Sequence, residues 1–184
     1  MKRGIIVLLI LVALAAACGG NEPVTLRLMT HDSFNVSEAV LAGFEEETGI
    51  TVEIFRAWVA GALVNQAVLA KDDPQADVIF GVDNTFLSRA TENDIFLAYE
   101  SPLLGDIPDA LKLDANFGAL PVDFGDVCLN YDKAWFVENG IAPPAGLEDL
   151  VDPTYACLTA VQIPATSSPG LAFLLATIDR FGEE

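Results

Sequence analysis

The side chains most suited to bind a ligand lie directly after three apolar segments of the sequence. They are Asp32, Ser33, Trp58, Asp83 and Asn84. Two carboxylates beside one cleft would hold a cation by charge-assisted hydrogen bonds, and an indole ring can stack on a flat heteroaromatic ring or a cation. Each position also has a structural interpretation, because Asp, Asn and Ser often cap a helix that follows a strand, and tryptophan often packs in a core. The residues define a candidate ligand site with a competing structural role.

A second group of polar side chains lies near the C-terminal end of the sequence, at Thr166, Ser167 and Ser168. Hydroxyl and backbone N–H groups at a helix N-terminus form a natural anion site, although they serve equally well as a cap without a ligand. His31 is the only histidine, and the sequence has no Gly-x-Ser-x-Gly motif, dinucleotide-binding glycine motif, P-loop or His/Cys cluster. We therefore expect no enzyme, no metal site and no cofactor.

Alternating strand and helix patterns place these residues at the ends of three strands, which we call the strand tips: Asp32 and Ser33, Trp58, and Asp83 and Asn84. The expected strands are residues 24–29, 51–55 and 76–82, the last buried on both faces. Asn35 with Glu38 indicates the start of a helix, Gly49 fits the position beyond its end, and a short helix is expected over 85–90. Such alternation favours a parallel α/β sheet, in which ligands bind beyond the carboxyl ends of the strands. The three tips should therefore face one edge of the sheet.

The pattern becomes irregular over residues 99–120 and extended over 121–131, where we expect a crossing between two lobes. The elements expected beyond it are helices at 132–139 and 146–150, a strand at 157–163 and a final helix capped by Ser168, with Pro169 at its first position. These elements are too few to close a second core. We expect a fragment of a longer two-lobed protein, with a first lobe at 24–120 and a crossing with a partial second lobe at 121–184.

The first residues have the pattern of an export signal. Two basic residues precede an apolar run at 5–14, which is too short to span a bilayer, and three alanines then precede a cysteine. Because this arrangement resembles the lipobox of bacterial lipoproteins, we predict a signal peptide at 1–17, a lipid anchor at Cys18 and a flexible tether at 18–23. An ordinary secretory signal is the alternative. Either way the protein is expected outside the cytoplasm, and the lipobox places it on the membrane.

Charge and cysteine content narrow the partners further. The formal net charge of −18 argues against nucleic acid, since phosphate backbones require clustered Lys and Arg. Besides Cys18, the chain has Cys128 and Cys157. A cysteine pair in an exported protein often forms a disulfide, which we predict here, with two free thiols as the alternative.

Five segments together resemble the thiamine-binding component of bacterial ABC importers. They are Thr30–Phe34, Ala76–Asn84, Pro121–Gly125, Asn130–Lys133 and Thr166–Leu171. The resemblance covers nearly the whole mature chain and roughly the first half of that family's length. It implies a two-lobed periplasmic-binding-protein-like fold of type II, with the first lobe essentially present and the second truncated. It also implies a monomer that binds thiamine or its phosphates between the lobes and delivers them to an ABC permease.

The resemblance carries site roles onto this sequence. Asp32, Ser33, Asp83 and Asn84 would line the cleft from the first lobe, Asp123 and Phe124 from the crossing, and Thr166, Ser167 and Ser168 from the second lobe. Phe124 stands where the family usually has tyrosine. The alternatives are a receptor for a polyamine or ferric iron on the same fold, and an anchored thiamine-phosphate hydrolase that uses His31.

Overall fold

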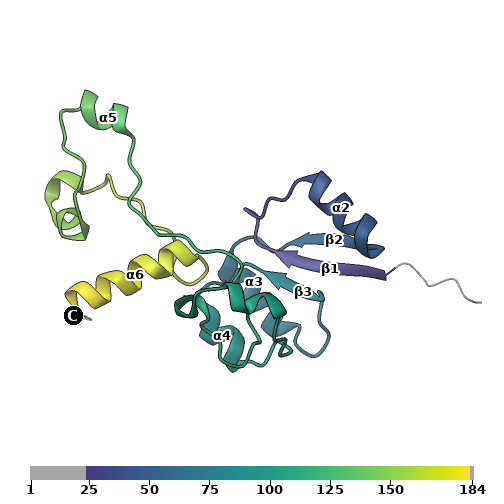
Figure 1. Ribbon diagram of the computed structural model, residues 1–184. Coiled ribbons are helices and arrows are strands. Elements are labelled where there is room, and N and C mark those ends of the chain that lie inside the picture. The colour runs from purple at the N-terminus through teal and green to yellow at the C-terminus, as the bar shows by residue number, and fades with distance from the viewer. Residues whose placement is uncertain (1–23, 183–184) are drawn as a thin grey trace, which may run out of the picture.

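The computed structural model describes residues 24–182 and begins with alternating strands and helices (Figure 1). The elements of this first part are β1 (Val24–Thr30), α2 (Glu38–Thr48), β2 (Ile50–Arg56), α3 (Ala60–Leu69), β3 (Val78–Phe80) and α4 (Leu87–Glu92). The three expected strands and the helices between them are therefore present. Their ends differ from the predicted ends by a few residues.

The three strands form one parallel sheet in the order β2-β1-β3. Thr30 at the end of β1 pairs with Arg56 at the end of β2 and with Phe80 at the end of β3. Because the pairing is parallel and these residues are in register, the carboxyl ends of all three strands meet at one edge. This confirms the predicted common edge.

Two local predictions in this part are wrong. Helix α2 is capped by Ser37, whose hydroxyl accepts a hydrogen bond from the Val40 N–H at 3.4 Å, so Asn35 is not its cap. Strand β3 is short, and Val78 is 43% exposed instead of buried on both faces. Among residues 24–182, β3 has a neighbouring strand on one side, β1, so it forms an edge of the sheet and part of its surface stays open. The expected helix end at Gly49 is correct, since this glycine adopts a left-handed φ of 70°.

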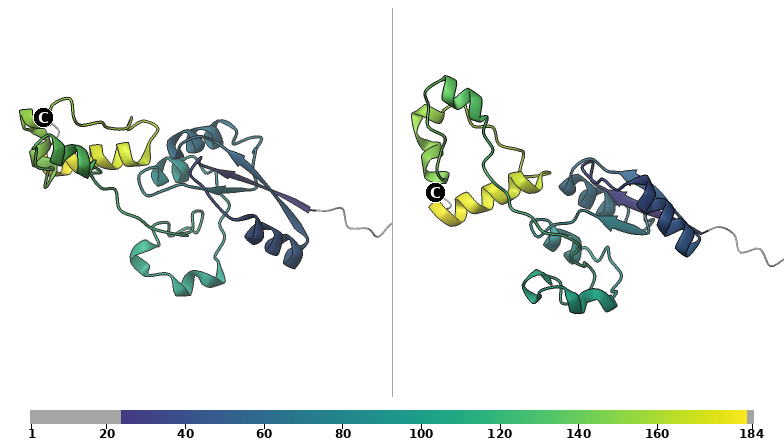
Figure 2. Two further views of the ribbon diagram at one scale, coloured as in Figure 1. Left: turned by 90° about the horizontal axis from the view of Figure 1, so that it is seen from above. Right: turned by 45° about the horizontal axis from the view of Figure 1, so that its top comes forward.

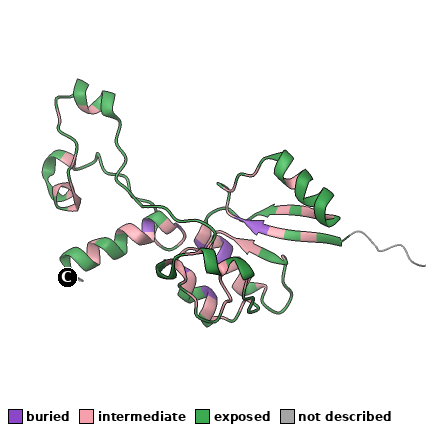
Figure 3. Ribbon diagram, in the orientation of Figure 1, coloured by how far each residue is buried: buried purple, intermediate pink, exposed green. Residues whose placement is uncertain are grey.

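The hydrophobic core lies between this sheet and helices α3 and α4 (Figure 3). Its buried residues are Met29, Ala57, Leu63, Val64, Phe86 and Ala90. Leu171, from the far end of the chain, is partly buried and packs against this cluster. One leucine thus connects the last helix to the core of the first part.

The second part of the chain is built differently. Two 3-10 turns, η1 (Pro102–Asp106) and η2 (Asp109–Leu111), precede it. Its own elements are α5 (Lys133–Glu138), η3 (Leu147–Val151), η4 (Pro153–Tyr155) and α6 (Ser168–Phe181). Residues 120–132 have no regular secondary structure, and the strand predicted at 157–163 is wrong. A strand needs a paired neighbour, and the described residues place none beside this segment. Two further views show α5, η3 and η4 lying away from the sheet (Figure 2).

Helix α6 begins one residue earlier than expected. Ser167 is its N-cap, so Ser168 is the first helical residue and Pro169 the second. At the other end of the helix, Arg180 forms an ion pair with Glu148 at 2.5 Å, which joins α6 to η3. The helix therefore connects the sheet to the distant 3-10 turns.

The signal peptide at 1–17, the anchor at Cys18 and the tether at 18–23 lie outside the described residues and stay predictions, as do the lobe boundaries at 120 and 121. None of the helices within residues 24–182 has the length and apolar character needed to cross a bilayer.

Candidate functional site

The tips of the three strands are joined by direct contacts. The Asp32 N–H donates a hydrogen bond to the Trp58 carbonyl at 2.7 Å, which connects the tips of β1 and β2. The rings of His31 and Phe34 pack against Phe80, with centroid distances of 5.9 and 5.0 Å, and so connect the tips of β1 and β3. The structure therefore brings together the three groups that the sequence placed at separate strand ends.

Two side chains at these tips are available to a ligand. Asp32 is exposed, and within residues 24–182 its carboxylate forms no hydrogen bond or ion pair. Trp58 is 76% exposed, which excludes the interpretation that it packs in the core. Its φ of 64° is left-handed, a region that non-glycine residues rarely adopt. A free carboxylate and an exposed indole ring thus belong to two residues joined by a backbone hydrogen bond.

Asp83 has a different role from Asp32. Its carboxylate accepts hydrogen bonds from the Thr85 N–H at 2.7 Å and from the Thr85 hydroxyl at 2.5 Å. These bonds close the turn that precedes α4. The N-cap of α4 is Phe86, without a side-chain capping bond, so Asp83 is not the helix cap given as the alternative for this residue. Ser33 and Asn84 are exposed beside the two aspartates. The two carboxylates are therefore not equivalent, and Asp32 is the one without an internal partner.

The third group, at the start of α6, contacts the first part of the chain through α3. The Gly61 N–H donates to the Thr166 carbonyl at 3.0 Å, and α3 begins directly after the Trp58 tip. Ser167 is buried and accepts from the Gly170 N–H at 3.2 Å. The Ser168 hydroxyl oxygen is also buried, and no partner for it lies among the described residues. A helix N-terminus with an unpaired hydroxyl therefore lies beside the tips.

Glycines allow these close approaches, and Gly61 and Gly81 are not among the predicted site residues. A Cβ on Gly61 would lie 2.6 Å from Phe86 Cζ and 2.8 Å from Thr166 Cα. A Cβ on Gly81 would overlap His31 Cδ2, and this glycine has a φ of 114°. Nothing in the local sequence pattern marks such contacts, because they form between residues far apart in the chain. A glycine inside an expected strand, as at Gly81, was the one available signal.

The structure does not bring Asp123 and Phe124 to the strand tips by any contact it records. Both side chains are exposed, Phe124 at 80%, and neither forms a hydrogen bond or an aromatic contact within residues 24–182. Their assignment to the site therefore rests on the resemblance alone.

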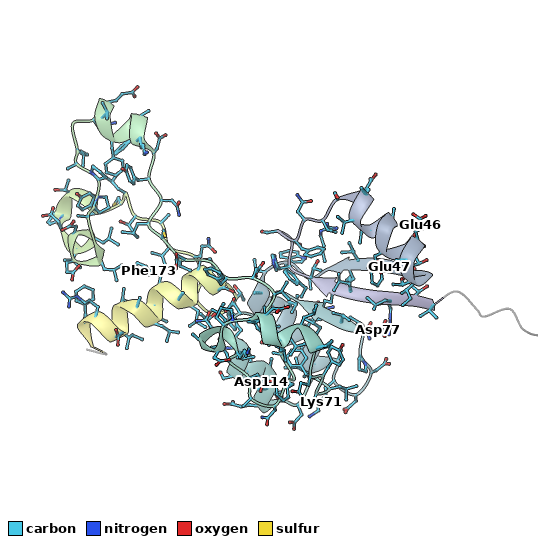
Figure 4. The ribbon with its side chains drawn as sticks, viewed as in Figure 1. Glu46, Glu47, Lys71, Asp77, Asp114 and Phe173 are labelled. Carbon is cyan, nitrogen blue, oxygen red and sulfur yellow. The ribbon has the colours of Figure 1, made fainter. Side chains whose placement is uncertain are left out.

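Two open hollows are each lined by one candidate residue, and neither is lined by Asp32 or Asp83. One, of about 460 Å³, is lined by Asn84, Leu87, Ser88, Thr91, Leu113 and Asp114. Asp114, labelled in Figure 4, accepts hydrogen bonds from three backbone N–H groups, of which that of Asn116 contributes most to lowering the pKa of its carboxyl below the usual 3.8. The other hollow, of about 490 Å³, lies along α3 and reaches Thr166. Each hollow thus contains one candidate residue.

The predicted disulfide is not formed in the structure. Cys128 and Cys157 are both free and exposed, the first in the extended segment before α5 and the second in the turn after η4, with a left-handed φ of 65°. No group of three or more acidic, histidine or cysteine side chains within residues 24–182 is placed to hold a metal ion.

Comparison with known proteins gives concordant matches. The family described as bacterial extracellular solute-binding protein matches residues 73–184. The chain is 30% identical over 172 residues to the thiamine-binding periplasmic protein of Salmonella typhimurium, covering 90% of this chain and 50% of that one. It is 29% identical over 181 residues to the protein of the same name from Brucella suis, covering 94% and 51%. The chain therefore spans about half the length of these relatives.

Solved structures agree on the fold. A periplasmic thiamin-binding protein matches with a TM-score of 0.62 at 22% identity, over 90% of this chain and 51% of the other. The periplasmic binding protein P5PA matches with a TM-score of 0.69 at 18% identity, over 87% and 52%. The predicted periplasmic-binding-protein fold of type II is confirmed over the half of these structures that the chain matches. Since the family match covers more than half of the chain and the fold agrees with it, the chain belongs to the bacterial extracellular solute-binding proteins.

Proposed function

We propose that this chain provides the first-lobe part of a thiamine-binding site in the solute receptor of an ABC importer. The hydrogen bond between the Asp32 N–H and the Trp58 carbonyl carries the proposal, because it joins the backbone of a residue with an unpaired carboxylate to that of a residue with an exposed indole ring. A cationic heteroaromatic ligand matches both groups, the charge with the carboxylate and the flat ring with the indole. The names of the Salmonella and Brucella relatives support thiamine as that ligand.

The start of α6 would hold the phosphate of a phosphorylated ligand. Anions bind at helix N-termini because the backbone N–H groups there point outward and the helix dipole is positive at that end. The Ser168 hydroxyl oxygen is buried and has no partner within the described residues, so it would turn outward to reach the phosphate. Thr166 is held against α3 by the Gly61 N–H, so this group stays beside the tips of the first lobe. Asp83, Ser33, Asn84, Asp123 and Phe124 complete the proposed contacts of the bound ligand.

The receptor would act outside the cytoplasm and pass its ligand to a permease. We attribute membrane attachment to acylation of Cys18 after removal of residues 1–17, and we expect a monomeric receptor. The periplasmic location in the names of the relatives supports export. A membrane tether would keep the receptor close to the permease subunits it must contact.

A binding role is favoured over hydrolysis by the position of His31. Its ring packs 5.9 Å from that of Phe80, and its Cδ2 fills the space where Gly81 lacks a side chain. This packing gives the histidine a structural role at the joined tips. Phosphate release from thiamine phosphate that depends on His31 would support the hydrolase alternative and contradict a pure binding role.

Titration calorimetry with thiamine and its phosphates tests the proposal. It should be run on the chain alone and on the chain extended by the second half of the Salmonella relative. We expect binding that Asp32→Asn weakens by about 10- to 150-fold, because a charge-assisted hydrogen bond contributes about 1.5–3 kcal/mol. The control is Asp72→Asn, which removes the same charge from an exposed turn between α3 and β3, at the other end of the strands. Absence of heat with every thiamine form, or tighter binding of a polyamine or ferric iron, would contradict the proposal.

A further inference from the structure

His31 lies where the tips of β1 and β3 meet, and it is the only histidine in the chain. Its ring packs on that of Phe80 at a centroid distance of 5.9 Å, and its Cδ2 atom fills the space where Gly81 has no side chain. The side chain is partly exposed, and its ring nitrogens form no hydrogen bond or ion pair among residues 24–182. These contacts fix the position of the ring and leave its nitrogens free to take up a proton.

The two aspartates of the strand tips adjoin this ring. Asp32 is the residue that follows His31, and consecutive Cα atoms are about 3.8 Å apart. Asp83 lies two residues after Gly81, which the ring contacts, and two residues span at most about 7 Å of backbone. Both backbone distances are shorter than the Debye length, which is about 8 Å at physiological ionic strength. A charge on the imidazole ring would therefore interact with both carboxylates.

One fixed positive charge also lies near this group of residues. The Arg56 guanidinium, at the end of β2, donates to the Phe34 carbonyl at 3.4 Å, and the Phe34 ring packs on the same Phe80 ring as His31. Arginine side chains keep their charge at every pH at which a protein stays folded, so this cation contributes a constant field. Among the charged groups beside His31, the imidazole itself is the one whose charge changes near neutral pH.

A proton on this ring opposes the binding of a cationic ligand. Histidine is the side chain that gains a positive charge as the pH falls from 8 to 5. Such a charge attracts the carboxylates of Asp32 and Asp83 and repels a ligand of its own sign. At separations of about 7 Å, this repulsion amounts to a several-fold change in affinity even at the high effective dielectric of a protein surface. The ligand and the proton therefore compete for the same negative field.

We propose that His31 sets the affinity of the strand tips for a cationic ligand according to pH. The tips bind the ligand when the ring is neutral and release it when the ring is protonated. Thermodynamic linkage requires the reverse effect as well, so a bound cation makes protonation of the ring less favourable. The inference rests on the proposed function, because it concerns the regulation of the same site and needs a ligand with a positive charge.

Titration calorimetry with thiamine at pH 8 and pH 6 gives the first test, on the chain alone and on the chain extended by the second half of the Salmonella relative. We expect the affinity to fall about three- to tenfold at pH 6. In His31→Gln, which removes the titrating group, the fall should be at most about half as large. His31→Phe keeps an aromatic ring on Phe80 and should behave in the same way, so either variant serves if the other does not fold. Because the titration of the ligand itself is common to all samples, it cancels in this comparison. An equal fall in the wild type and in a folded variant would overturn the proposal.

Proton NMR gives a second test that a purely structural histidine would not pass. The imidazole signal of His31 is identified by its loss in His31→Gln, and its titration is followed without ligand and at saturating thiamine. We expect the midpoint of this titration to move to lower pH when thiamine is bound. An unchanged midpoint would overturn this inference and leave thiamine binding intact. Absence of thiamine binding at every pH would overturn the proposed function and this inference together, so the two failures are distinguishable.

Discussion

Residues 24–120 form a hydrophobic core, whereas residues 121–182 do not, although both parts have similar local sequence patterns. The first part contains all six buried hydrophobic residues of the described core, and its three strands are paired in register. The second part contains a 14-residue helix and several short turns, yet none of its hydrophobic side chains is buried. Capping residues and apolar periodicity favour helices in both parts. A core forms only where the sheet provides a surface for them to pack against.

The comparison explains why the candidate site is unequal across the two parts. The strand tips are fixed by parallel pairing and by the Asp32 to Trp58 hydrogen bond. The start of α6 is fixed because Thr166 contacts Gly61 and Leu171 packs on the first core. Asp123 and Phe124 lie in an unpaired segment and have no such support. Residues are therefore positioned well only where they contact the sheet or α3.

The largest expected difference comes from truncating one leucine in each part. Leu63 is fully buried in α3, so Leu63→Ala should lower the free energy of unfolding by about 2–5 kcal/mol. Leu174 on α6 is 40% exposed, and Leu174→Ala should cost less than about 1 kcal/mol. Urea unfolding followed by circular dichroism measures both. Equal losses would show that the second part has a core of its own, which would break the comparison.

The next effect concerns the joint between the two parts. Gly61→Ala would place a Cβ 2.8 Å from the Thr166 backbone, so α6 must shift or the N-terminus of α3 must open. We expect a loss of about 1–3 kcal/mol from this overpacking, measured by the same urea titration. Gly43→Ala is the control, because its Cβ would meet nothing within 4 Å in helix α2 and alanine should add about 0.5–1 kcal/mol of stability. A neutral Gly61→Ala variant would mean that α6 is not held against α3.

The sequence predicted those parts of the fold that depend on local pattern and strand order. The strands and helices of the first part, the common edge and the left-handed Gly49 all follow from apolar periodicity, turn residues and parallel topology. The strand expected at 157–163 was wrong because an apolar alternation becomes a strand only beside a partner. The helix starts at Ser37 and Ser167 were each missed by one or two residues, since several capping residues lie next to one another.

The residue types of the site were predictable from the sequence, whereas the hydrogen bonds and close contacts among them were not. Asp32 and Asp83 have the same sequence context, an aspartate after an apolar strand, yet one is free and the other holds Thr85. The close approach of Gly61 to Thr166 joins residues about a hundred positions apart, which no local pattern can show. The left-handed φ of Trp58 and its hydrogen bond with the Asp32 N–H likewise involve the neighbouring strand and are not visible in the local sequence.

A smaller effect compares the helix caps of the two parts. Ser167 is buried and accepts from the Gly170 N–H at 3.2 Å, so Ser167→Ala should destabilise α6 by about 1 kcal/mol. Ser37 caps α2 in an exposed position through a longer bond of 3.4 Å, and Ser37→Ala should cost less. Amide exchange in the first turn of each helix measures the difference. If Ser37→Ala had the larger effect, burial at the α6 cap would not strengthen it.

The smallest expected effect is a pH dependence that also differs between the parts. In the fold, hydrogen bonds from the N–H groups of Asn116, Ala119 and Gly118 lower the pKa of the Asp114 carboxyl, and bonds from Thr154 lower the pKa of Asp152 in the second part. A carboxyl whose pKa is lower in the folded state stabilises the fold above its unfolded pKa, near 3.8, and this contribution is lost as the pH falls through the folded pKa. Asp114→Asn and Asp152→Asn should therefore each reduce the decrease in the free energy of unfolding between pH 5 and pH 2. The reduction should be on the order of a few tenths of the wild-type decrease for Asp114→Asn and smaller for Asp152→Asn. Thermal unfolding across this pH range tests the order, because Asp114 closes a loop next to the core while Asp152 closes a single exposed turn. A larger effect at Asp152 would mean that local hydrogen bonds stabilise the second part more than its lack of buried side chains indicates.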